Sequence, residues 1–169
     1  MGKCCVGALS MKVIYCNRHP NKAAENELNA RIVSFDELLA QSDVLSVHAN
    51  LTSETRGIFD KTAFAKMKPS SIFVNASRGE LHNEQDLTEV LSNGKIWGAG
   101  LDVTNPEPMR PDNPLLSMPN VSVLPHIGSA TVETRVAMTK LAAENIVAGL
   151  KGERLPHAVN PEVYELGTR

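Results

Sequence analysis

The 169-residue sequence lacks the features that mark several classes of protein. Its formal net charge of −2 provides no broad basic surface for nucleic acid or for an anionic membrane. No apolar run reaches the roughly 20 residues that a membrane-spanning helix needs. Only three cysteines are present (Cys4, Cys5 and Cys16), and two are adjacent, so no disulfide framework is expected. We therefore expect a cytoplasmic protein with neither nucleic-acid nor membrane partners.

Two kinds of catalytic pattern are also missing. The histidines lack the spacing of a zinc site and no cysteine pair supplies further ligands, so no metal centre is expected. No Gly-x-Ser-x-Gly segment indicates a hydrolase nucleophile. Of the five histidines, His19, His82 and His157 are expected at the surface, and His48 is expected to be a packing or loop-anchoring residue.

What the sequence does contain is an alternation of strand and helix patterns. Its hydrophobic content of 42% and charged content of 21% are ordinary for one globular domain. Helix-capping residues occur at Ser34, Asp60 and Asn83, and a long helix is expected over residues 131–150. Strands are expected at residues 11–16, 44–49, 72–75, 96–103 and 121–124. This order predicts an α/β fold with a doubly wound parallel sheet.

Polar side chains follow each predicted strand at the point where it ends. Because parallel strands end at one edge of a sheet, these groups should line a common ligand crevice. They are Asn17 and Arg18, the loop 50–56, Ser77 and Arg78, Asp102, and His126.

Three segments, in this order, resemble the D-isomer-specific 2-hydroxyacid dehydrogenases. They are residues 74–80 (VNASRGE), 100–108 (GLDVTNPEP) and 124–131 (LPHIGSAT). The arginine, carboxylate and histidine of that family's triad match Arg78, Glu107 and His126. The resemblance implies that Arg78 binds the substrate carboxylate, that Glu107 orients His126, and that His126 donates a proton. It also implies a Rossmann-like dinucleotide-binding domain over residues 1–152 and a C-terminal tail over 153–169.

The same resemblance implies a nicotinamide dinucleotide cofactor. NAD-preferring members usually carry an acidic residue after the first of these strands, where this chain has Asn17 and Arg18, as the glyoxylate/hydroxypyruvate reductase branch does. A guanidinium suits a 2′-phosphate, so NADPH is expected in preference to NADH. Arg18 as a plain surface residue and Asp102 as a turn cap are alternatives. The cofactor contacts implied are Asn17, Arg18, Leu51, Thr52, Thr55, Asn75, Ala76, Ser77, Asp102 and Gly128.

The family's Gly-x-Gly-x-x-Gly turn and the strand before it are not recognisable in residues 1–10. The dinucleotide-binding domain is therefore expected to be incomplete at its N-terminal end, with an unpaired strand edge in the middle region of the sheet. We expect an NAD(P)H-dependent reductase of small 2-oxo acids such as glyoxylate or hydroxypyruvate, in a truncated form with little activity alone. The full-length family member is expected to be a homodimer. The alternatives are a non-catalytic dinucleotide-binding scaffold, similar to the family's corepressors, and an inactive remnant.

Overall fold

The computed structural model describes residues 1–165, which fall into two compact units. The first unit is Met1–His126 and the second begins at Ile127. This division by packing differs from the domain boundary predicted at residue 152, which stays a prediction. Residues 166–169 of the predicted tail lie outside the described residues.

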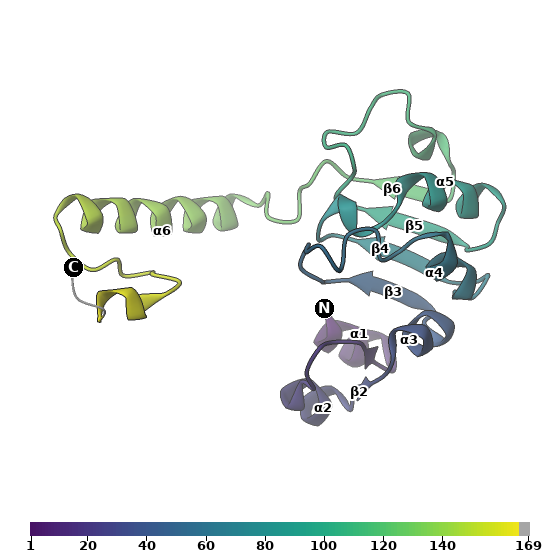
Figure 1. Cartoon of the computed structure of the whole chain (residues 1–169), viewed down its shortest axis with the longest axis horizontal. Helices are drawn as coiled ribbons and strands as arrows, with labels where there is room; N and C mark the ends of the chain where they lie inside the picture. Colours follow the sequence, from purple (N-terminus) through teal and green to yellow (C-terminus); the bar gives the residue numbers. More distant parts are fainter. Residues whose placement is uncertain (166–169) are drawn as a thin grey trace. The chain divides into compact units, whose positions relative to one another are not determined.

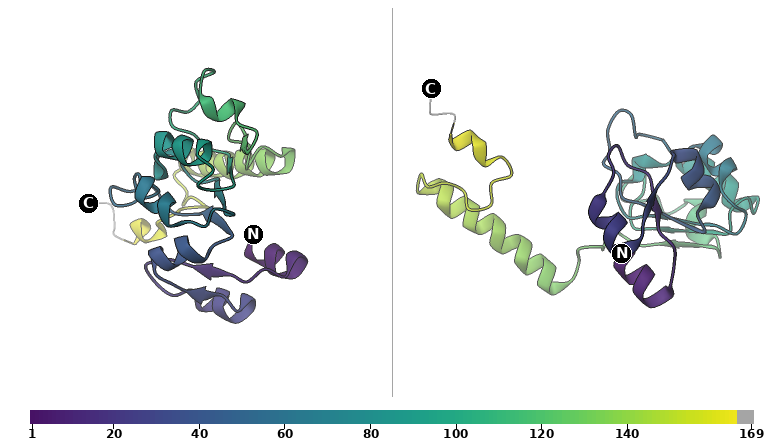
Figure 2. Two further views of the ribbon diagram at one scale, coloured as in Figure 1. Left: turned by 90° about the vertical axis from the view of Figure 1, so that its right-hand side faces the viewer. Right: turned by 90° about the horizontal axis from the view of Figure 1, so that it is seen from below.

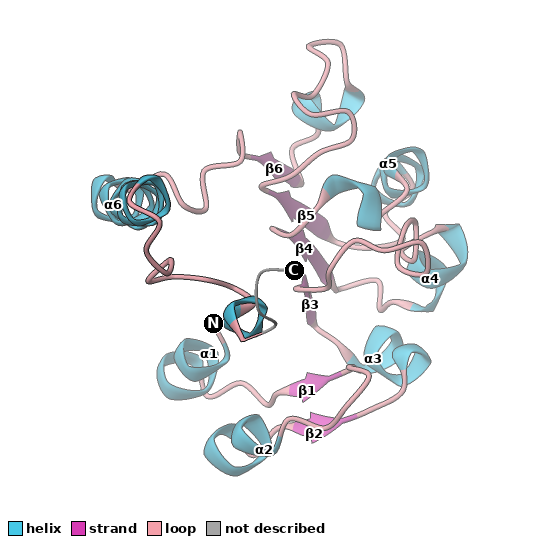
Figure 3. Ribbon diagram, turned by 60° about the vertical axis from the view of Figure 1, so that its left-hand side comes forward, coloured by secondary structure: helices cyan, strands magenta, loops and turns pink. Residues whose placement is uncertain are grey.

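A four-stranded parallel sheet forms the centre of the first unit, in the order β3-β4-β5-β6 (Figure 3). Strand β4 pairs with β3 on one side and with β5 on the other, so it lies inside the sheet. The predicted parallel α/β fold is confirmed, and the strand predicted at 72–75 is found at those residues. The strands are β3 (Val44–Val47), β4 (Ile72–Asn75), β5 (Gly98–Leu101) and β6 (Val121–Val123).

Helices α3 (Phe35–Gln41), α4 (Lys61–Lys66) and α5 (Glu84–Ser92) follow β2, β3 and β4 in the chain. Figure 1 shows α4 and α5 beside the main sheet. Each helix begins at its predicted cap, where a side-chain oxygen accepts a backbone N–H bond and contributes about 1 kcal/mol. Gly94 (φ 64°) ends the α5 segment in a left-handed conformation.

The core of this unit is built around Phe73 on β4, which is fully buried. The rings of Phe59 and Phe64 each meet it edge to face at 5.2 Å, and Phe35 meets Phe59 at 5.5 Å. Such aromatic pairs add about 0.5–1.5 kcal/mol beyond the area they bury. The ring of His82 also lies against Phe73, at 5.8 Å between centroids, and only 2% of the residue is exposed. The surface position predicted for His82 is therefore wrong.

The N-terminal part of the first unit contains elements that the sequence analysis missed. They are α1 (Gly2–Leu9), α2 (Lys22–Leu28) and β2 (Arg31–Ile32). Strand β1 (Ile14–Tyr15) is shorter than the predicted strand 11–16 and pairs in parallel with β2 as a separate sheet. Within residues 1–165, β3 pairs with β4 alone, so the other edge of β3 has no strand partner.

The second unit consists of a long helix and an irregular return segment. Helix α6 (Val132–Leu150) is the long helix of this unit (Figure 2). Its N-cap is Thr131, whose hydroxyl accepts a bond from the backbone N–H of Thr134. It ends near the predicted stop, with Gly152 at φ 72°. Asn145 on α6 holds the backbone of His157 in the return segment by two hydrogen bonds. Among residues 1–165, no helix combines the length and apolar character needed to cross a bilayer.

Candidate active site

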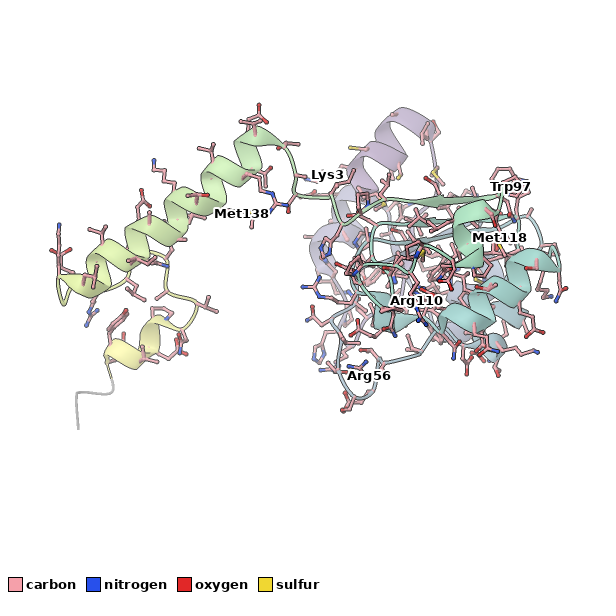
Figure 4. The ribbon with its side chains drawn as sticks, turned by 90° about the horizontal axis from the view of Figure 1, so that it is seen from above. Lys3, Arg56, Trp97, Arg110, Met118 and Met138 are labelled. Atoms are coloured by element: carbon pink, nitrogen blue, oxygen red, sulfur yellow. The ribbon has the colours of Figure 1, made fainter. Side chains whose placement is uncertain are left out.

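The carboxyl ends of the four main strands are tied to one another by hydrogen bonds. The hydroxyl of Ser77, after β4, donates to the carbonyl of Val47 on β3 at 2.9 Å. The backbone N–H of Asp102, after β5, donates to the carbonyl of Asn75 at 2.9 Å. The loop that follows β6 is joined to β5 through its first residue in the same way. The loops after these strands therefore form one continuous rim, as expected for parallel strands. In Figure 4, Arg56 in the loop after β3 and Trp97 just before β5 lie on opposite sides of the unit.

His126 and Glu107 meet at this rim through a short contact. Nδ1 of His126 lies 2.6 Å from Oε1 of Glu107, and both side chains are a little less than half exposed. His126 holds φ at 55°, a left-handed conformation that costs a residue with a Cβ about 1–2 kcal/mol. Strained backbone of this kind is concentrated at functional sites.

The electrostatics of the pair define which nitrogen of His126 faces outward. The hydrogen bond with His126 lowers the pKa of Glu107, and the backbone N–H of Thr104 and the charges of His126 and Arg78 lower that pKa further. Glu107 is therefore a carboxylate at neutral pH, and Nδ1 of His126 must be the donor to it. Nε2 is then the nitrogen that can exchange a proton with a ligand. Because the charge of Arg78 also lowers the pKa of Glu107, all three residues of the predicted triad lie at the same rim.

A close backbone approach brings the Arg78 loop against the Glu107 loop. A Cβ on Gly79 would overlap the backbone carbonyl of Thr104, so this contact requires glycine. Thr104 in turn holds the Glu107 turn, because its hydroxyl donates to the carbonyl of Pro106 and its N–H reaches Glu107 at 3.4 Å. Arg78 itself is exposed and donates from Nη1 to the carbonyl of Ser77 at 2.7 Å.

Asn75, at the end of β4, is fully buried and uses its amide inside the protein. Its Oδ1 accepts the N–H of Ser77 at 3.0 Å, and its Nδ2 donates to the carbonyl of Arg78 at 2.9 Å. Nδ2 also lies 3.0 Å from Nδ1 of His82. The contact with a cofactor predicted for Asn75 stays a prediction, whereas its bonds show that it shapes the loop that carries Arg78.

Sequence reasoning missed His82 as part of this site. A signal for its burial does exist, because His82 directly precedes Asn83, the N-cap of α5. The residue at this position often packs against the fourth residue of the helix, which here is the fully buried Leu87. The position before the cap, rather than the type of residue, is therefore the signal that could have indicated burial.

Most of the other residues predicted to contact a cofactor lie in segments that follow strands β1, β3, β4 and β5 of the first unit. Hydrogen bonding to Thr52 lowers the pKa of Glu54, and the charge of Arg18 contributes as well, so the end of β1 lies near the loop after β3. The hydroxyl of Thr55 accepts the N–H of Thr52 and donates to the carbonyl of Asn50, which fixes that loop. Asn17 and Ala76 are exposed, Leu51 and Asp102 are half-buried, and Gly128 belongs to the second unit.

This set of groups fits a nicotinamide dinucleotide. An exposed guanidinium, small residues and hydroxyl groups along strand ends suit a phosphorylated ligand. In the part of the chain that the structure describes, no group of three His, Cys, Asp or Glu side chains is placed to hold a metal ion. The contacts predicted for the individual residues stay predictions.

Comparison with known proteins gives a consistent assignment. The profile of the D-isomer specific 2-hydroxyacid dehydrogenase NAD-binding domain matches residues 3–128. Glyoxylate/hydroxypyruvate reductase B of Pectobacterium carotovorum is 49% identical over 156 residues, which cover 92% of this chain and 49% of the relative. The human glyoxylate reductase/hydroxypyruvate reductase is 48% identical over 145 residues, covering 86% of this chain and 44% of the relative.

Solved structures agree with the sequence matches. The TT0316 protein of Thermus thermophilus superposes with a TM-score of 0.84 and 41% identity, covering 90% of this chain and 47% of that one. The chain thus spans about half the length of the curated relatives it matches. The family match covers the rim and its three predicted triad residues. The chain belongs to the D-isomer specific 2-hydroxyacid dehydrogenase family, through that family's NAD-binding domain.

Proposed function

We propose that this chain carries the catalytic rim of an NAD(P)H-dependent reductase that converts small 2-oxo acids into 2-hydroxy acids. The observation that carries the proposal is the 2.6 Å contact between Glu107 and His126, with the charge of Arg78 acting on the same carboxylate. Glyoxylate and hydroxypyruvate are the proposed substrates, because the relatives are named as reductases of these two acids.

Each triad residue has a defined task in this proposal. A bound dinucleotide would supply the hydride that reduces the carbonyl carbon of the substrate. Nε2 of His126 gives a proton to the carbonyl oxygen, so that the C=O bond becomes an alcohol. Glu107 holds the ring by Nδ1 and stabilises the protonated imidazole before transfer. Arg78 binds the substrate carboxylate through its planar guanidinium, which matches two carboxylate oxygens.

Cofactor preference is a finer part of the proposal. Arg18 is exposed after β1, close enough to the loop after β3 for its charge to reach Glu54. A guanidinium in this place suits the 2′-phosphate of NADPH, so we propose NADPH as the preferred cofactor. A homodimeric full-length protein and a cytoplasmic location belong to the same proposal.

The test measures binding and turnover separately on the chain as it is. NADPH binding is followed by calorimetry, and NADPH oxidation is followed by absorbance with glyoxylate and with hydroxypyruvate. Because the chain spans about half of its relatives' length, we expect weak turnover that falls at least tenfold in His126→Gln, since a general acid contributes about 10²–10⁴ in rate.

Two outcomes would overturn the proposal. Turnover that is equal in the wild-type chain and in His126→Gln would remove the proton-donor role. NADPH binding without turnover, at any enzyme concentration and with either acid, would favour a dinucleotide-binding scaffold instead.

A further inference from the structure

His82 is a buried histidine that the proposed reaction does not use. It lies in the first unit between the arginine loop and α5, with 2% of its surface exposed. Phe73 covers its ring edge to face, and its backbone bridges that of Phe59 in parallel. A histidine carries two polar nitrogens, so such a position is costly unless the ring has a hydrogen-bonding task.

The hydrogen bonds of Asn75 define that task. The N–H of Ser77 can only donate, so the oxygen Oδ1 of Asn75 must face it. The nitrogen Nδ2 then donates one hydrogen to the carbonyl of Arg78 and points the other at Nδ1 of His82, 3.0 Å away. Nδ1 must accept, so the neutral ring carries its proton on Nε2.

The remaining nitrogen shows what this arrangement costs. Within the described part of the chain, Nε2 of His82 is buried and has no hydrogen-bond partner. A buried donor without a partner destabilises the folded state, because it has lost its hydrogen bonds to water and gained none in the protein. An apolar residue would avoid this cost but would leave the second amide hydrogen of Asn75 without a directed acceptor. The histidine therefore stabilises one orientation of the amide at the expense of an unpaired N–H.

We infer that His82 is a positioning residue for Arg78, acting through the amide of Asn75. The His82 ring fixes the amide, and the amide fixes both the N–H of Ser77 and the carbonyl of Arg78. The backbone on each side of the Arg78 Cα is then held in one conformation. The side chain of Arg78 therefore extends from a fixed position on the rim. The consequence for substrate binding rests on the proposed function, whereas the fixed loop does not.

The experiment compares two single variants with the wild-type chain by NMR. His82→Phe keeps an aromatic ring against Phe73 and removes the acceptor. Leu39→Ala, at a fully buried position on α3, lowers global stability and takes no part in the hydrogen bonds that join His82, Asn75 and Arg78. We expect ¹⁵N spectra of the wild-type chain to show His82 protonated on Nε2. We expect the amide hydrogen of Ser77 to exchange about tenfold faster in His82→Phe, but at the rate set by global stability in Leu39→Ala.

A kinetic readout then connects the loop to Arg78. If the proposed reductase activity is present, His82→Phe should raise the KM for glyoxylate several-fold with a smaller change in kcat, because Arg78 binds the carboxylate. Faster Ser77 exchange without any turnover would leave the positioning role intact and reject the proposed function. Unchanged Ser77 exchange in His82→Phe, or a proton found on Nδ1 in the wild-type chain, would overturn the inference.

Discussion

Acidification should destabilise this protein through His82 before its carboxylates begin to titrate. Burial lowers the pKa of His82 from 6.5 to about 4. In the unfolded chain the ring binds a proton near its ordinary value, whereas the folded chain resists protonation down to about pH 4. The unfolded state therefore binds more protons between these limits. The stabilising contribution is complete above about pH 6.5 and is lost as the pH falls toward 4.

The size of the effect follows from the two pKa values. A difference of about 2.5 pH units, at roughly 1.4 kcal/mol per unit, gives about 3 kcal/mol when the loss is complete. At about pH 5 the loss is roughly 2 kcal/mol. Marginal stabilities of about 5–15 kcal/mol make such a change easy to measure. Carboxyl groups with lowered pKa values, such as Glu37 and Glu107, lose their contribution only as the pH falls below about 4.5.

Urea unfolding of the wild-type chain and of His82→Phe, at about pH 7.5 and about pH 5, isolates this contribution. The variant removes the titrating group and retains a ring next to Phe73. We expect the wild-type chain to lose about 2 kcal/mol more than the variant between the two pH values. Equal losses in the two proteins would refute the reasoning, because they would show that the His82 ring is protonated equally easily in the folded and unfolded chains.

Three further predictions concern the rim. Gly79→Ala should lower the free energy of unfolding in urea by about 3 kcal/mol or more, because its Cβ would overlap the Thr104 carbonyl. Gly7→Ala, in a helix with open space around it, should not lower that free energy, and equal effects of the two variants would refute the contact. NADPH should raise the melting temperature more than NADH, and Arg18→Ala should abolish the difference; equal shifts in the wild-type chain would remove the role of Arg18. Glu107→Gln should lower turnover at least tenfold, since the amide keeps the shape of the side chain but loses the charge that stabilises the protonated His126; unchanged turnover would contradict that role.

The parts of the fold that the sequence predicted are those with strong local signals. Strand β4 is a short apolar run, and α3, α4 and α5 each begin at a residue that caps a helix by itself. The missed helices lack an apolar pattern, although the side chain of Asn21 caps α2 in the same way. Helix α1 carries two glycines, and α2 is mostly polar; neither has a buried residue, so no apolar periodicity marks them. Strand β2 has two residues, both exposed, and only its pairing with β1 defines it.

The candidate site divides in the same way. The position of Arg78 and His126 at the rim was predictable because each follows a strand and parallel strands end at one edge, whereas Glu107 was predicted only from the resemblance of its segment to the family; the roles of all three stay predictions. The burial of His82 was not predicted, because its neighbours Asn83 and Glu84 are polar and suggest a surface turn. Its environment comes from Phe59 and Phe73, which are distant in sequence and reach it only through the packing of β4 and the bridge to residue 59.

In the first unit, a series of contacts links the buried His82 to the three residues of the proposed triad. The path runs from His82 through Asn75 to the Arg78 loop, across Gly79 to Thr104, and on to Glu107 and its partner histidine. Each step is a hydrogen bond or a close backbone approach, either within the segment that follows one strand or between the loops that follow adjacent parallel strands. A disturbance at one end should therefore weaken the geometry at the other without unfolding the sheet. Because water exclusion requires more than a rim, cofactor binding and loop order should survive in this chain even where turnover is slow.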